Sequence, residues 1–198
     1  MNNKLLSLID ELNELKSVSI ENEIINNEEL TYVSYAYCSF LDCKFSETYF
    51  NYNTVDTTTF KHIEFTNCVF NKSNFKNTSF IDCKFVNTSF VECKINDNLF
   101  ENSFMEYITF DKCNIINSIF NINNFNNLVL KNSSLTKINF KNCNIINLEI
   151  DKLKCNEVYF NTSKLSHVNG DLINLKNANI SSIQALEIIV EMGINLVE

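Results

Sequence analysis

Cysteine is the residue type whose number and spacing in this chain could support metal binding or disulfide formation. The chain has eight cysteines; Cys38 and Cys43 are five residues apart, and Cys93 and Cys113 are twenty apart. A zinc site would need further cysteines or histidines at suitable spacing, and no histidine accompanies either pair in that way. A small buried thiol behaves as a hydrophobic side chain. We therefore expect free, inert core thiols in a reducing compartment, with no metal site and no cofactor.

The other groups that could carry catalysis are scattered along the chain. The only two histidines, His62 and His167, are far apart in the sequence, and we interpret them as isolated surface residues. The Asp and Glu residues stand singly, so no acid–base pair can be recognised. No phosphate-binding glycine loop, dinucleotide fingerprint or nucleophile elbow occurs, and the chain has only two glycines. We therefore predict no catalytic residues and no enzymatic activity.

Composition narrows the class of protein further. The chain has 198 residues, of which 45% are hydrophobic, and this is enough for one domain with a sizeable core. No run reaches the roughly 18 apolar residues of a membrane span, and the N-terminus lacks the pattern of a secretory signal. We therefore expect a cytoplasmic protein without membrane association. The net charge of −8 argues against direct nucleic-acid binding. The 35 asparagines and the absence of Arg and Pro resemble an AT-rich coding bias and suggest a bacterial source.

A five-residue repeat positions almost every large apolar side chain. From Leu30 to Ile180 every fifth residue except Gly170 is apolar or aromatic, and this register contains sixteen of the seventeen phenylalanines. The position two residues earlier is small or aliphatic in all but three of its thirty occurrences, and all 28 charged residues of the region avoid both positions. The three exceptions at the earlier position are Asn53, Asn98 and Asn123.

The period of five excludes both simple regular structures. In a helix each residue advances by about 100°, so residues five apart lie about 140° apart around the axis. The apolar residues would then be spread around the helix instead of forming one stripe. In a long strand, residues five apart face opposite sides. The inward positions i−2 and i do share one side of a short extended segment, so the chain must run extended for about three residues, turn and repeat. This predicts an all-β solenoid, and the phenylalanine matches at spacings of fifteen and twenty do not by themselves decide the number of sides.

The repeat resembles that of the pentapeptide-repeat family, whose unit is a small residue, a polar residue, a central Leu or Phe and two polar residues. Residues 78–92 show three such units in succession, beginning with Thr-Ser-Phe-Ile-Asp, and Ala-Asn-Ile at 178–180 is close to the commoner Ala-Asn-Leu form. The resemblance implies a right-handed quadrilateral β-helix with twenty residues per coil. Phenylalanines at this spacing would then stack as a structural core ladder, made of Phe40, Phe60, Phe80, Phe100, Phe120, Phe140 and Phe160.

Both ends of the repeat carry a helical pattern, as expected for caps that cover the open ends of a β-solenoid. Ser181 and Gln184 have the spacing of a capping box that opens a C-terminal helix. We therefore divide the chain into an N-terminal helix and degenerate first coil over 1–29, with the coil beginning near residue 18, a β-helix over 30–180, and a C-terminal helix over 181–198. The leucines at helical spacing near the N-terminus are Leu5, Leu8, Leu12 and Leu15.

The C-terminal segment is more apolar than one buried helix face requires. One interpretation is that the helix only caps the final coil. The other adds a partner, most simply a second copy related by two-fold symmetry, and the resemblance agrees with this because some pentapeptide-repeat proteins dimerise through a C-terminal helix. The residues of this candidate cap or dimer interface are Ile183, Leu186, Ile189, Val190, Ile194, Leu196 and Val197.

Binding remains as the class of function. We expect a non-enzymatic protein-interaction or scaffold module, whose protein partner the sequence does not identify, with outward aromatic residues such as Tyr37, Tyr52, Phe104 and Tyr107 as candidate contacts. The resemblance implies an alternative, because several family members mimic duplex DNA, bind type II topoisomerases such as gyrase and confer fluoroquinolone resistance. Residues 30–180 hold 14 acidic residues and 14 lysines, so no anionic stripe supports that alternative.

Overall fold

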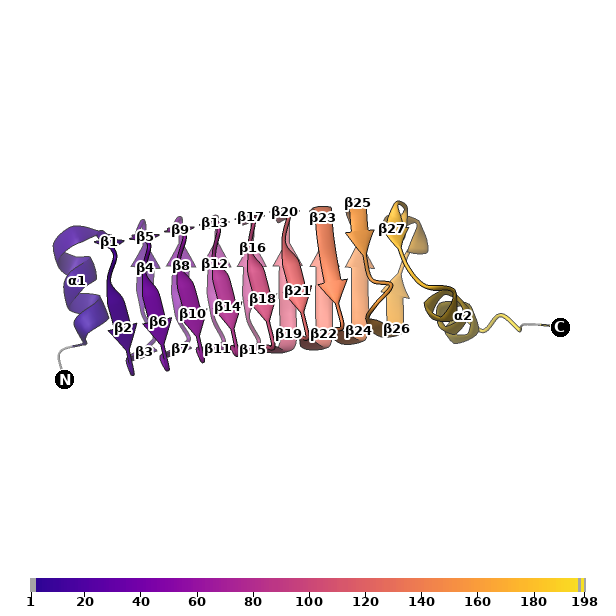
Figure 1. The fold of residues 1–198 in the computed structure, drawn as a ribbon, viewed down its shortest axis with the longest axis horizontal. Coiled ribbons are helices and arrows are strands. Elements are labelled where there is room, and N and C mark those ends of the chain that lie inside the picture. Colours follow the sequence, from indigo (N-terminus) through magenta and orange to yellow (C-terminus); the bar gives the residue numbers. More distant parts are fainter. Residues whose placement is uncertain (1–2, 196, 198) are drawn as a thin grey trace.

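The computed structural model of the protein describes residues 3–195 and residue 197. The chain winds into a parallel β-solenoid of about eight coils with one short helix at each end (Figure 1). This confirms the solenoid and the helical caps predicted from the repeat. The helices are α1 (Lys4–Leu12), the 3₁₀ helix η1 (Leu172–Leu175) and α2 (Ser182–Glu191).

The strands are short because each occupies one side of a coil. Those of the first four coils and of the first half of the fifth span three residues each: β1 (Glu14–Lys16), β2 (Ser19–Glu21), β3 (Ile24–Asn26), β4 (Glu29–Thr31), β5 (Ser34–Ala36), β6 (Ser39–Leu41), β7 (Lys44–Ser46), β8 (Tyr49–Asn51), β9 (Thr54–Asp56), β10 (Thr59–Lys61), β11 (Glu64–Thr66), β12 (Val69–Asn71), β13 (Asn74–Lys76), β14 (Ser79–Ile81), β15 (Lys84–Val86), β16 (Ser89–Val91), β17 (Lys94–Asn96) and β18 (Leu99–Glu101). Several of the later strands continue through a corner: β19 (Phe104–Asp111), β20 (Asn114–Ile116), β21 (Ile119–Asn121), β22 (Asn124–Lys131), β23 (Ser134–Lys141), β24 (Asn144–Asp151), β25 (Lys154–Tyr159), β26 (Lys164–Gly170) and β27 (Ala178–Asn179).

Each coil has four sides and twenty residues. β5 is the fourth strand after β1 and pairs with it in parallel, with Glu14 level with Ser34. The same register continues along the rod, so that Phe60 on β10 lies level with Phe40 on β6 and with Phe80 on β14. The quadrilateral coil implied by the family resemblance is therefore confirmed, and the spacing of twenty is the one that the structure uses.

The corners of the coils between Ser17 and Glu157 turn through the left-handed region of backbone conformation. From Ser17 to Glu157 each residue two positions after an inward centre has φ between 48 and 61°. Asparagine, which tolerates this conformation best after glycine, is frequent there, but Ile122 adopts it too. The corner N–H groups pair with the next coil, as when Tyr37 N–H donates to the Asp56 carbonyl over 3.0 Å. Stacking of the coils therefore imposes the corner geometry on every residue type.

Phenylalanine fills the lumen. The seven rings from Phe40 to Phe160 at a spacing of twenty are buried, and each stacks on the next with centroids 4.5–4.9 Å apart and planes within 14° of parallel. Rings on adjoining sides meet edge to face, as do Phe60 and Phe65 at 6.0 Å. The spacing between stacked strands matches the preferred separation of offset aromatic rings, so the backbone repeat and the core are mutually consistent.

The small inward residues bind the backbone of the neighbouring coil as well as making room for the rings. The Ser73 hydroxyl donates to the Phe50 carbonyl over 2.9 Å and accepts from Asn53 N–H over 3.0 Å. Asn53 repeats this one coil earlier, since its Oδ1 accepts from Val33 N–H and its Nδ2 donates to the Leu30 carbonyl, both over 2.9 Å. Asn98 and Asn123 make the same pair of bonds on two other sides of the coil. The asparagines at the small-residue position are therefore members of the hydrogen-bonded ladders that line these sides.

The first coil begins earlier than residue 18. Leu15, whose spacing fitted a helix, points inward from β1 and is buried, whereas α1 ends at Leu12. The inward Glu23 is half-buried because its carboxylate accepts from Lys4 N–H over 3.1 Å. A carboxylate at the N-terminus of a helix is favourable, because the helix leaves unpaired N–H groups there. An acidic residue at an inward position thus joins the first coil to its cap.

The register breaks at Gly170 for a steric reason. Its φ is 111°, and a Cβ atom at this position would lie 2.0 Å from the carbonyl oxygen of Ile150 in the previous coil. No other residue type fits this approach without a shift of the backbone. The glycine ends β26, after which η1 and β27 complete the last coil.

Candidate interaction surfaces

The interior of the described chain holds thiols that are protected from reaction. All eight cysteines are free and buried. Burial raises the pKa of Cys68 to about 11 and that of Cys83 to about 12. Hydrogen bonding with Cys93, followed by burial, raises the pKa of Cys113. Because the thiolate is the reactive form, these thiols are poor nucleophiles at neutral pH. Within residues 3–195 and 197, no group of three or more His, Cys, Asp or Glu side chains is arranged to hold a metal ion.

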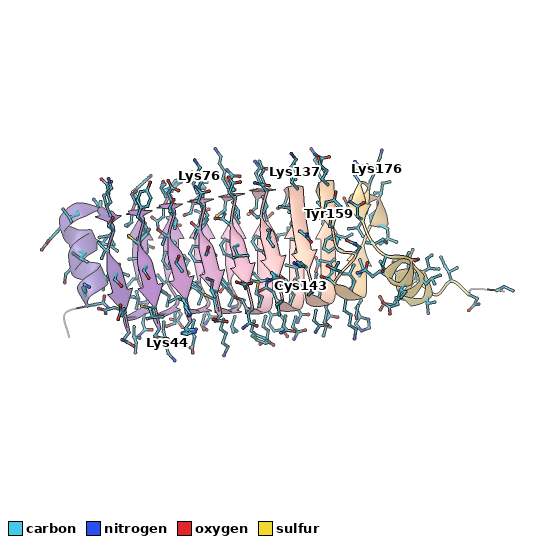
Figure 2. All side chains as sticks on the ribbon, in the orientation of Figure 1. Lys44, Lys76, Lys137, Cys143, Tyr159 and Lys176 are labelled. Carbon is cyan, nitrogen blue, oxygen red and sulfur yellow. The ribbon has the colours of Figure 1, made fainter. Side chains whose placement is uncertain are left out.

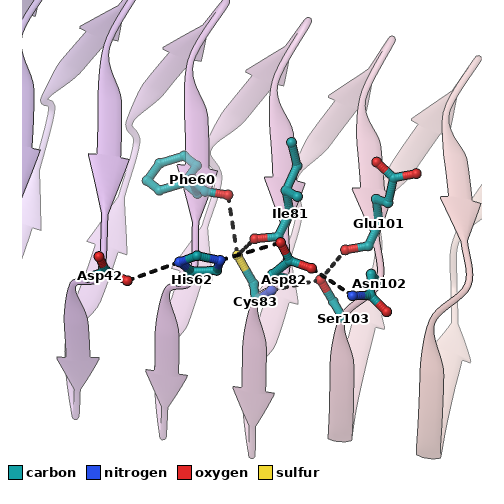
Figure 3. Close-up of polar contacts among 9 residues, drawn as sticks. All are labelled: Asp42, Phe60, His62, Ile81, Asp82, Cys83, Glu101, Asn102 and Ser103. Atoms are coloured by element: carbon teal, nitrogen blue, oxygen red, sulfur yellow. Dashed lines mark hydrogen bonds and ion pairs between the residues drawn. The ribbon is translucent and has the colours of Figure 1, made fainter.

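His62 lies in a corner column between two aspartates. Its Nδ1 is 3.0 Å from Asp42 Oδ1 and its Nε2 is 3.5 Å from Asp82 Oδ2 (Figure 3). Asn102 continues the column by donating from Nδ2 to Asp82 Oδ1 over 2.7 Å. These side chains are twenty residues apart and open to solvent, so they form a ladder along the outside of the rod rather than a cleft. His167 lies in the last coil, and the structure does not bring the two histidines together.

Lysines and a glutamate alternate along one corner of the rod. Lys72 and Lys112 lie 3.9 and 3.7 Å from the carboxylate of Glu92, one coil away on either side. Ion pairs of this kind spread charge instead of collecting one sign. Figure 2 shows Lys76 and Lys137 projecting from one edge of the rod. The described surface therefore agrees with the absence of an anionic stripe inferred from the sequence.

Helix α2 closes the C-terminal end of the solenoid by its polar side chains. The predicted capping box is confirmed, since Ser181 and Gln184 exchange side-chain and backbone hydrogen bonds. Gln184 is buried, and its Nε2 donates to the carbonyls of Phe160 over 2.8 Å and Ser163 over 2.5 Å. These carbonyls belong to the last turn of the coil, where no further strand follows to pair with them. Gln184 therefore supplies hydrogen bonds that a following coil would otherwise make.

A second anchor lies at the other end of the same helix. The carboxylate of Glu191 accepts from His167 N–H, with its two oxygens at 3.0 and 2.9 Å from the nitrogen. This N–H lies on the outer edge of β26, which pairs only with β24. Between the two anchors, Ile188 is the one apolar residue of α2 that is buried. The cap thus uses one narrow face of the helix.

The remaining face of α2 and the segment after it expose a row of apolar side chains. Of the residues assigned to a cap or dimer interface, Ile189 is half-buried and five are exposed, from 49% for Leu186 to 91% for Val197. Leu196 lies outside the described residues. The other exposed members are Ile183, Val190 and Ile194. The helix stands at the end of the rod (Figure 1). Leu186 and Val190 line an open hollow with Leu165 and His167 of β26, so the described chain covers this face only in part.

A stack of tyrosines marks the N-terminal part of the rod. Tyr32 and Tyr52 occupy the same corner one coil apart, with ring centroids 4.9 Å apart and planes inclined by 16°. The Lys72 ammonium lies 5.4 Å from the centroid of the Tyr52 ring and donates to its hydroxyl over 3.3 Å. We call Tyr32, Tyr52 and Lys72 the tyrosine corner. Tyr52 was predicted only as one of several outward aromatic residues. Its spacing of twenty residues from Tyr32, which is one coil, already indicated that the two rings stack.

The other outward aromatics are also exposed. Tyr37, Phe104 and Tyr107 have between 41 and 59% of their surface accessible. None of the three stacks on another aromatic ring within the described residues. They lie singly on the surface, unlike the tyrosine corner.

No helix in the described part of the chain is long and apolar enough to cross a membrane. This finding concerns the helices of residues 3–195 and 197 only.

Comparison with known proteins agrees with the repeat. The family model for pentapeptide repeats matches residues 60–97 in eight copies. Among curated proteins, none matches the chain. A solved structure of trypsin-treated QnrB1, a plasmid-mediated fluoroquinolone resistance protein, is 15% identical, covers 93% of this chain and 99% of its own, and has a TM-score of 0.42.

Two cyanobacterial pentapeptide-repeat proteins are similar as well. HetL of Nostoc sp. strain PCC 7120, involved in regulating heterocyst differentiation, is 9% identical over 90% of this chain and 94% of its own, with a TM-score of 0.28. Rfr23 of Cyanothece 51142 is 10% identical over 89% of this chain and 97% of its own, also with a TM-score of 0.28. The repeats of residues 60–97 are therefore pentapeptide repeats, and their inward register and four-sided coil continue through the rest of the solenoid.

Proposed function

We propose that the protein is a non-enzymatic interaction or scaffold module that works in the cytoplasm and binds a second copy of itself through α2. The observation that carries the proposal is the division of α2 into a narrow anchored face and an uncovered apolar one. The packed lumen and the protonated thiols support a binding role over catalysis. Eight free thiols also suit a reducing compartment.

A second copy is the simplest occupant of the apolar face. Two helices related by a two-fold axis would bury the same residues against each other, with Leu186 and Val190 near the axis. Such a contact removes apolar surface from water, which stabilises association by about 25 cal/mol per Å² buried. The rod would then be doubled in length, with both outer surfaces left free for other proteins.

Light scattering tests this proposal. We expect the unaltered protein to have about twice the chain mass of 23.0 kDa, and Leu186→Asp to reduce it to the monomer, because a buried, unpaired carboxylate is costly. Ile24→Asp is the matched control, since Ile24 is 61% exposed at the opposite end. A monomer at high protein concentration, or a dimer that Leu186→Asp leaves intact, would contradict the proposal.

The alternative from the family resemblance is a DNA mimic that binds a type II topoisomerase. Alternating ion pairs and the lysines along one edge disfavour it, because a mimic of DNA needs a continuous negative field. We expect neither inhibition of gyrase supercoiling nor protection from a fluoroquinolone at micromolar protein. Either effect in a supercoiling assay would establish the alternative instead.

A further inference from the structure

The tyrosine corner holds one cation and leaves one ring face open. Lys72 covers the Tyr52 end of the stack. Tyr32, at the other end, is 68% exposed and stacks only on Tyr52 within the described residues. The equivalent corner one coil earlier is Leu12, the last residue of α1, which is itself 61% exposed. The column of stacked side chains therefore ends in an aromatic ring that faces solvent.

Carboxylates flank this open ring on both sides of the corner. Glu29 lies on β4, three residues before Tyr32, and is level with Tyr49 on β8. Glu14 lies on β1 and is level with Ser34, two residues after Tyr32. Both are exposed, and neither forms an ion pair within the described residues. The whole N-terminal region of 29 residues holds seven acidic residues and two lysines, so its field attracts cations.

We infer that Tyr32, with Glu14 and Glu29, docks an arginine or lysine side chain of a partner polypeptide. The inference rests on the proposed interaction function and specifies the chemistry of the partner. A ring face attracts a cation through its quadrupole, and the contact of Lys72 with Tyr52 shows this stack binding one. An arginine suits the site best, because its planar guanidinium stacks on a ring while its N–H groups bind a carboxylate. Tyrosine also offers a large, rigid contact at low entropic cost, as it does in other interfaces.

The probes for this inference are a nona-arginine peptide and the neutral sugar cellohexaose. In protein labelled with ¹³C at the tyrosine rings, we expect nona-arginine to shift the Tyr32 and Tyr52 signals. The signals of Tyr107 and Tyr159, exposed elsewhere on the rod, serve as internal controls and should stay in place. Equal shifts at all four rings would overturn the inference, because they would show attraction to the net negative charge alone. A shift of Tyr32 by cellohexaose and not by the peptide would overturn it in favour of a carbohydrate site.

Matched variants give the size of the effect by fluorescence anisotropy of labelled nona-arginine. We expect Tyr32→Ala to weaken binding about three- to fivefold, within the range of an exposed cation–π contact, and Tyr107→Ala to change it less than twofold. Glu14→Gln with Glu29→Gln should weaken binding more than Glu47→Gln with Glu157→Gln, which removes the same charge from exposed, unpaired positions outside the tyrosine corner. The site would be refuted if Tyr32→Ala and Tyr107→Ala weakened binding equally, or if the two double glutamine variants did.

The failure of this inference is distinguishable from failure of the proposed function. Circular dichroism and light scattering of Tyr32→Ala should show an unchanged coil and an unchanged mass, because Tyr32 lies between β4 and β5, which are near the end of the rod opposite α2 (Figure 1). If the protein dimerises but does not bind the peptide, only the cation site is refuted. A monomer that binds the peptide through Tyr32 would refute only the contact through α2.

Discussion

The two ends of the rod are closed by helices of similar length that differ in what they bury. α1 buries Leu5 and Ile9 against the first coil and turns its polar residues to water. α2 buries one glutamine and one isoleucine, and exposes apolar side chains. Both helices prevent further strands from adding to the open sheet edges. The N-terminal cap buries mainly apolar side chains and adds hydrogen bonds from Asn3 and Lys4 to the first coil. The C-terminal cap buries only one large apolar side chain and relies mainly on hydrogen bonds to the last coil.

This difference indicates separate roles for the two caps. An apolar face that is not needed for closing the solenoid costs solubility, so its presence in α2 fits a surface that becomes covered on association. The N-terminal helix exposes one large apolar side chain, Leu12, and the exposed residues near it are Ile24, tyrosines and carboxylates. Stability should therefore depend on apolar side chains at the first cap and on polar ones at the second.

The largest effect should come from truncating the apolar anchor of α1. Leu5 is fully buried, and Leu5→Ala should lower the free energy of unfolding by about 3 kcal/mol, since it removes apolar contacts and leaves a cavity. Leu186→Ala, in the other cap, should change it by less than about 0.5 kcal/mol in the monomer, because the side chain already meets solvent. Urea unfolding followed by circular dichroism measures both. Similar losses in the two variants would remove the contrast between the caps.

At the C-terminal cap the sensitive residue should be Gln184. Gln184→Leu keeps the volume but removes the donor to the carbonyls of Phe160 and Ser163. The Phe160 carbonyl still accepts from Ser163 N–H, whereas the Ser163 carbonyl loses its partner, at a cost of about 2 kcal/mol. Hydrogen exchange should show faster opening of α2 and β26, while the middle coils keep their protection. Ile183→Leu, at an exposed position of the same helix, is the control. Unchanged exchange at α2 in the glutamine variant would show that Ile188 alone holds the cap.

The sequence allowed the coil to be predicted in detail and its surfaces only in part. Burial dictates the repeat, because only positions i−2 and i face the lumen, and a strict pattern results. Leu15 was assigned to the N-terminal helix because one apolar residue fits both the last turn of a helix and the first inward position of a coil. The role of Asn53 was missed because its partners are twenty and twenty-three residues away. The tyrosine stack depends on the same spacing, so outward positions too must be compared one coil apart.

The smallest predicted effect concerns an unpaired hydroxyl group in the core near the N-terminal end of the rod. Tyr35 occupies an inward position and is buried, and its hydroxyl has no hydrogen-bond partner in the described part of the chain. Burial also raises the pKa of this tyrosine above its usual range. Tyr35→Phe should therefore increase the free energy of unfolding by about 1 kcal/mol, because it removes an unpaired polar group and keeps the ring.

A small cavity beside Tyr35 makes this prediction informative in both directions. The cavity measures about 10 Å³ and is lined by Leu5, Phe40 and Asn53 among others, and a space of this size is at the lower limit for one water molecule. Thermal unfolding of Tyr35→Phe, with the exposed Tyr107→Phe as control, separates the cases. A gain in stability shows that the hydroxyl is unpaired and that the N-terminal cap closes a dry core. A loss would contradict the prediction, since it requires a buried water that pairs with the hydroxyl, and the N-terminal end would then rely on polar contacts as the C-terminal end does.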